Sequence, residues 1–161
     1  MGEHPIAARH TRSVGASGAT GESLRGAACR GRHNRVVARP RIDPAAGREA
    51  VLAVARARRE GTMADRASQR LASRFLAQVL ADRAPGHSVE VRVPPHCAVQ
   101  AVPGPRHRRG TPSAVVEMTP ETWFDLATGA VGWEQARAAG LVRASGERAD
   151  LSPWLPLMTV P

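Results

Sequence analysis

Alternating apolar and polar residues predict a small sheet in the middle of the chain. Residues 89–93, VEVRV, alternate valine with Glu90 and Arg92, the pattern of a half-buried strand. Residues 97–102 are apolar on both faces except at one glutamine, which favours a central strand, and residues 115–118 resume the strand pattern. Three strands at this spacing fit an antiparallel meander, although the long connection before the third strand permits another order.

Two helices are predicted before this sheet. Helix 43–60 begins with Asp43 as N-cap and Pro44 in its first turn, and Gly61 can end it. It has few large apolar residues, which predicts a place at the edge of the domain. Helix 65–82 carries two adjacent apolar rows, so one of its faces must be buried, most simply against the sheet.

The chain after the sheet supplies most of its large apolar residues. Thr119 and Pro120 predict the start of a further helix that Gly129 ends, and a short helix at 133–139 precedes a strand at 141–145. The last apolar residues are predicted to form a lid that closes the core or a cavity: Leu151, Trp154, Leu155 and Leu157.

Charge divides the chain unevenly. The net charge is +9 over 161 residues, yet residues 1–62 hold 12 arginines and 5 acidic residues, whereas residues 63–161 hold 11 and 9. Residues 1–41 lack any apolar period, so we interpret them as a disordered basic tail or an overlong start, with an organelle-targeting peptide as a weaker reading. Residues 42–161 then form one domain. A basic tail can contact nucleic acid, but the predicted sheet contains no aromatic residue for base stacking, which makes nucleic acid an unlikely partner.

Cellular location is inferred from what the sequence lacks. It has no continuous apolar segment of the kind found in secretory signals, and no run of about 20 apolar residues that spans a bilayer. Its two cysteines, Cys29 and Cys97, are poorly placed for a structural disulfide. These features favour a cytoplasmic protein without a membrane span.

Candidate catalytic and metal-binding residues are few. His87, His96, Cys97 and His107 are potential metal ligands, but no pair has the spacing of a zinc motif. A Cys97–His107 nucleophilic pair is conceivable, since neighbouring arginines would favour a thiolate. We expect neither a metal nor another cofactor, and no catalytic residue is assigned, so enzymatic activity is left open with the balance against it.

The segment PGPRHRRGTP, residues 103–112, is the best candidate for an anionic contact. Its prolines and glycines exclude a strand or a helix, and its arginines suit a carboxylate, a phosphate or nucleic acid. The alternative is a solvated loop, or an arginine that pairs with Glu90 or Glu117.

Several longer segments occur together in an order that resembles a known family. These are SVEVRVPP, AVQ, GPRHRRGTP, VVEM, PETWFDLATG and WEQARAAGLVRASGERADLSPWLPL, while RIDPAAGREAVLAV resembles the N-terminal helix. The sequence resembles the bacterial, actinobacterial, orthologue group of the sterol carrier protein superfamily over about residues 41–157. The resemblance implies an α+β fold: a mixed or antiparallel sheet of about five strands with helices over one face enclosing an apolar tunnel.

The resemblance also implies a function. Wider members bind lipids, fatty acyl chains or sterols without catalysis, so the leading hypothesis is a binding module for an apolar small molecule. The predicted cavity wall comprises Leu76, Val99, Trp123, Leu126 and Trp154, and Arg106 or Arg109 would contact a charged head group. The alternative is an accessory domain acting through a protein partner, related to the C-terminal domain of mycothiol-dependent maleylpyruvate isomerases. Nucleic-acid contact through the tail is the weaker alternative.

Overall fold

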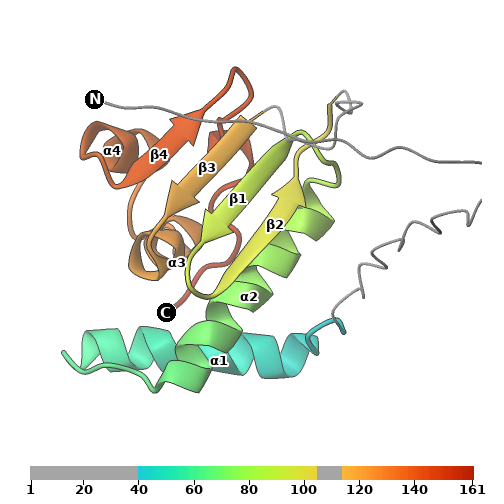
Figure 1. The fold of residues 1–161 in the computed structure, drawn as a ribbon. Coiled ribbons are helices and arrows are strands. Elements are labelled where there is room, and N and C mark those ends of the chain that lie inside the picture. The colour runs from blue at the N-terminus through green and yellow to red at the C-terminus, as the bar shows by residue number, and fades with distance from the viewer. Residues whose placement is uncertain (1–39, 105–113) are drawn as a thin grey trace, which may run out of the picture. The chain divides into compact units, whose positions relative to one another are not determined.

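The computed structural model describes residues 40–104 and 114–161 of the chain. This part is a mixed α+β structure of helices and one four-stranded sheet (Figure 1). In chain order its elements are α1 (Pro44–Arg59), α2 (Arg66–Arg83), β1 (Val89–Val93), β2 (Cys97–Ala101), β3 (Ala114–Met118), α3 (Pro120–Thr128), α4 (Trp133–Ala138), β4 (Val142–Ser145) and the 3₁₀ turn η1 (Ser152–Trp154).

The sheet differs from the predicted one in strand number and order. In the described residues it has four strands, not about five, in the order β2-β1-β3-β4. β1 pairs antiparallel with β2 and parallel with β3, and β3 pairs antiparallel with β4. The first three strands therefore do not form a meander, because the chain crosses from one edge of the sheet to place β3 on the far side of β1. β2 is an edge strand, and its prediction as a central strand was wrong.

The two faces of the sheet differ in polarity. Val89, Val91 and Val93 of β1 are buried, whereas Arg92 between them is exposed. Val116 of β3 lies beside Val91 on the buried face. In Figure 1, α2 lies behind β1 and β2, and the near face of the sheet has no helix of the described residues over it. The apolar core lies between the buried face and the helices.

α1 and α2 cross at close range. Asp43 caps α1 by accepting a hydrogen bond from the Ala46 N–H, and Asp65 caps α2 in the same way. At the crossing, Gly47 of α1 faces the ring of Phe75 in α2, and a Cβ at Gly47 would lie 2.2 Å from Phe75 Cδ2. A side chain smaller than alanine is therefore needed on α1 at this point.

α3 begins and ends at the residues that its local chemistry predicts. The Thr119 side chain accepts a hydrogen bond from the Thr122 N–H, and Pro120 occupies the first turn. Gly129 ends the helix with φ 82°, a left-handed conformation that glycine adopts without strain. These caps fix the length of the helix that carries Trp123 into the core.

The C-terminal segment is fastened to α2 by one arginine. Arg83 donates to the carbonyl oxygens of Trp154 at 3.0 Å, Pro156 at 2.6 Å and Leu157 at 2.8 Å. Leu157 is buried, and its N–H donates to the Ala127 carbonyl oxygen in α3. The segment thus packs on the core rather than extending away from it.

Two predictions concern parts of the chain that the structure addresses only in part. Residues 1–39 lie outside the described residues, so the tail interpretation stays a prediction, as does a single domain over residues 42–161. Over residues 40–104 and 114–161, no helix combines the length and apolar character needed to cross a bilayer.

Candidate functional site

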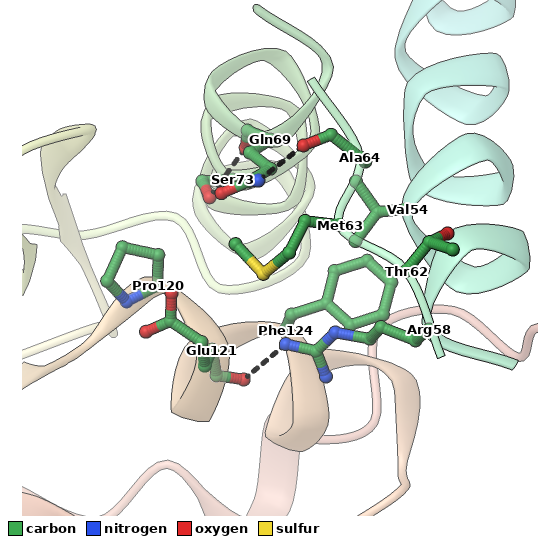
Figure 2. Close-up of a pocket in the computed structure, with 10 residues that line it drawn as sticks. All are labelled: Val54, Arg58, Thr62, Met63, Ala64, Gln69, Ser73, Pro120, Glu121 and Phe124. Carbon is green, nitrogen blue, oxygen red and sulfur yellow. Dashed lines mark hydrogen bonds between the residues drawn. The ribbon is translucent and has the colours of Figure 1, made fainter. Parts of the chain in front are cut away.

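A small pocket lies where the α1–α2 loop meets α3 (Figure 2). Its apolar lining comes from three segments, one of which is distant in sequence from the other two, so the pocket exists only in the folded chain. α1 contributes Val54, the loop Met63 and Ala64, and α3 Pro120 and Phe124. Val54 and Phe124 are also members of the buried core, so the pocket is a surface opening onto that core.

Met63 is the most unusual residue of this lining. Its side chain is 81% exposed, although the residue is apolar. Figure 2 shows it extending from the loop into the space between α2 and α3. The residue is therefore placed to cover the pocket or to contact whatever enters it.

Polar groups surround the same opening. Arg58 lies over the Phe124 ring, 4.6 Å from its centroid, and pairs with Asp125. A second Arg58 nitrogen donates weakly to the Glu121 carbonyl oxygen at 3.4 Å (Figure 2). This arginine ties α1 to α3 across the pocket, and its cation rests on an aromatic face.

The size of the pocket limits what it can hold as it stands. Its cavity volume is about 60 Å³. Pockets that bury a small organic ligand usually measure about 300–1,000 Å³. A long apolar ligand therefore needs movement of the α1–α2 loop or of the Met63 side chain.

Ser73 of α2 joins this pocket to the sheet. Its hydroxyl donates to the Gln69 carbonyl oxygen and lies 2.9 Å from His96 Nδ1. Its carbonyl oxygen accepts from Trp123 Nε1 at 3.1 Å and from Cys97 Sγ at 3.7 Å. Ser73 thus connects the pocket wall, the β1–β2 turn and α3 through hydrogen bonds.

The surroundings of His96 favour its neutral form. Burial is the largest cause that lowers its pKa from the ordinary value of 6.5, and the positive charge of Arg70 lowers it further. The carboxylate of Glu121 acts in the opposite direction but does not prevail. His96 thus contacts α2 through Ser73, and charges on both α2 and α3 act on its imidazole.

We expect the lowered pKa of His96 to make stability depend on pH. In the unfolded chain the imidazole takes up a proton at about pH 6.5, whereas the folded chain resists this until lower pH. The contribution of neutral His96 to the free energy of unfolding is therefore fully present above about pH 6.5. It is lost as the pH falls through the pKa that His96 has in the folded chain. Urea unfolding between about pH 5 and pH 8 should show this slope, and His96→Gln should reduce it. His87→Gln, at an exposed histidine, is the matched control, and an equal reduction there would contradict the assignment.

The predicted cavity wall gathers in the core rather than around this pocket. Leu76, Trp123 and Leu126 are fully buried, and Val99 and Trp154 pack against the same cluster. None of the five is among the residues that line the pocket. Their role as ligand contacts stays a prediction. Arg106 and Arg109, the predicted head-group contacts, lie outside the described residues.

The potential metal ligands are distributed over separate places. His87 Nδ1 lies 2.7 Å from Gln100 Oε1 at one end of the β1–β2 hairpin, and His96 and Cys97 lie at the other end. His107 is outside the described residues, and with it the predicted Cys97–His107 pair. Over the described ranges, no three His, Cys, Asp or Glu side chains come together as a metal site would require.

The residues that line the pocket were not predicted from the sequence to do so. Met63 and Ala64 lie in a loop whose sequence carries no motif, and Glu121 looks like an ordinary first-turn acid of α3. The single available signal was Met63, a large apolar residue between two helices.

This fold and pocket define a class of protein: a small α+β domain with an apolar core and a surface pocket that opens onto that core. Residues 65–157, more than half of the chain, match the sequence model of the family described as bacterial SCP ortholog, where SCP denotes sterol carrier protein. The chain belongs to this bacterial sterol carrier protein-like family. The matched range begins at the cap of α2, so α1 precedes it. No curated protein matches the chain.

Proposed function

We propose that this protein is a non-catalytic carrier that binds an apolar ligand, of the lipid, fatty acyl or sterol-like kind, through the pocket beneath Met63. Family membership suggests a lipid-binding module. The observation that carries the proposal is the pocket itself, an opening onto the core with an exposed methionine over it.

The pocket supports this function through its chemistry. Its walls are mostly apolar, and Arg58 and Glu121 lie at its border. Such an arrangement suits an apolar body inside and a polar end near solvent. Because methionine is unbranched and adaptable, Met63 can change rotamer to admit a ligand and then pack against it.

We expect Met63→Asp to weaken binding of a fluorescent fatty acid about tenfold or more. The change removes an apolar contact, worth about 1.5 kcal/mol or more, and places a charge beside an apolar ligand. Fluorescence titration of the full-length chain measures the dissociation constant. The matched control is Leu141→Asp, at another exposed apolar residue that lies in a different surface groove.

The outcomes separate the alternatives. Equal weakening by both substitutions would place the binding site elsewhere than beneath Met63. Absence of any bound fatty acid, together with native mass spectrometry that finds no co-purified lipid, would contradict the carrier function. It would then favour an accessory domain that acts through protein contacts.

Which residue would contact the charged end of a ligand is a separate proposal. Arg106 and Arg109 were predicted for this role and lie outside the described residues. Arg58, already beside the pocket, is a second candidate, although it is paired with Asp125.

A further inference from the structure

Three arginines form a stripe along α2 without acidic partners. Arg66, Arg70 and Arg74 follow one another at intervals of four residues, so they lie on one side of the helix. Arg66 and Arg70 are exposed, and Arg74 is half-buried. Within residues 40–104 and 114–161, the ion pairs of the structure involve other arginines. Their positive charge is therefore available to an external anion.

The stripe also borders a shallow depression on the surface of α2. Ala67 and Leu71, the residues that follow Arg66 and Arg70 in the chain, line this depression together with the three arginines. Guanidinium groups around such a depression suit phosphate oxygens, which they can bind with two parallel hydrogen bonds.

The stripe lies beside the candidate ligand pocket. Gln69 and Ser73 line that pocket, and Arg70 and Arg74 are the next residues in the chain. One residue corresponds to a rotation of about 100° on a helix, so stripe and pocket wall are adjacent sides of α2. Met63, 81% exposed, lies just before the helix begins.

We propose that the Arg66–Arg70–Arg74 stripe docks the protein on an anionic lipid bilayer, with Met63 entering the membrane interface. The inference rests on the proposed carrier function, because it places the pocket opening near the lipid. Charge complementarity favours an anionic surface, and the exposed methionine favours a bilayer over a purely polar partner.

The test compares two charge-matched triple variants of the full-length chain. In the first, Arg66, Arg70 and Arg74 are changed to glutamine. In the second, the same change is made at three exposed arginines on other segments: Arg48, Arg137 and Arg148. Both variants keep the N-terminal basic residues and have the same net charge. Co-sedimentation is measured with vesicles of phosphatidylcholine alone and of phosphatidylcholine mixed with phosphatidylglycerol.

We expect the stripe variant to bind the mixed vesicles about a hundredfold more weakly, about fivefold for each arginine, and the control variant to lose much less. Arg70→Gln alone should lose about fivefold and serves if the triple variant folds poorly. Binding of the unaltered chain should weaken as salt is raised.

Three results would overturn the proposal. The first is an equal loss of vesicle binding by both triple variants, and the second is equal binding of the unaltered chain to vesicles with and without phosphatidylglycerol. The third is a stripe variant that loses affinity for single-stranded DNA or an acidic peptide but keeps its affinity for vesicles. Fatty-acid binding in solution, measured on the same variants, separates the two proposals. Docking without fatty-acid binding would contradict only the carrier function, and fatty-acid binding without docking only the present inference.

Discussion

Replacing Trp123 by alanine is expected to lower the free energy of unfolding by about 3–5 kcal/mol. The side chain is fully buried, so its removal leaves a large cavity in the core. It also removes the hydrogen bond from the indole N–H to the Ser73 carbonyl oxygen, which joins α3 to α2. Urea unfolding followed by circular dichroism measures the change. A loss below about 1 kcal/mol would show that the core does not depend on this residue.

Two phenylalanine substitutions separate the hydrogen bond from the volume. Trp123→Phe keeps most of the apolar area and loses the bond to Ser73, so we expect a cost of about 1–3 kcal/mol. Trp133 is also buried, but its indole nitrogen has no acceptor among the described residues. Trp133→Phe removes a polar group without a partner there and should cost less. Equal costs would assign the Trp123 effect to packing alone.

Gly47→Ala is expected to destabilise the protein by about 1–3 kcal/mol, although alanine favours helices. The new methyl group would lie 2.2 Å from Phe75 Cδ2 and 2.3 Å from Cγ, so α1 and α2 must move apart. Helix propensity alone predicts the opposite sign, a gain of about 1 kcal/mol. Thermal and urea unfolding therefore distinguish the two effects by direction.

A double-mutant cycle gives the control for this contact. Phe75→Leu removes the ring that the new methyl group meets, at its own cost in core packing. If the contact is the cause, the double variant should be more stable than the sum of the two single changes predicts. Simple additivity would contradict this explanation.

Local sequence chemistry predicted the ends of the elements well. Asp43 with Pro44 and Thr119 with Pro120 each mark a helix start, because a capping side chain and a proline act within one turn. Gly129 ends α3 for an equally local reason, since its backbone adopts a positive φ. Capping residues, prolines and glycines act on the backbone within a few residues of their own position, so the sequence alone is enough to place these helix ends.

The pairing of the strands could not be obtained in this way. The alternation in β1 shows which side chains face inward, but it does not say which strand lies beside it. In β2 the solvent-facing side includes Ala98, a small residue rather than a charged one. The sequence of β2 therefore resembles that of a strand buried on both faces. The number of strands came from a family resemblance, and the described part of this chain has four.

The candidate pocket depends on distant parts of the chain meeting. Met63 and Phe124 are about sixty residues apart, and nothing in the sequence indicates that they share a cavity lining. The predicted wall residues Leu76 and Trp123 were chosen for their apolar character, which is the property of core residues as well. Sequence therefore predicted that an apolar interior exists but not where it opens.

The parallel pairing of β1 with β3 has a consequence for how the chain reaches its native state. The β1–β2 hairpin has a short connection and can form from neighbouring residues. The central pair must instead bring Val89 beside Ala114, after β2 has turned back along the edge. Closing such a loop costs entropy before its contacts compensate, and non-local pairing slows folding. We therefore expect α2 and the hairpin to form early and the joining of β3 to β1 to limit the folding rate.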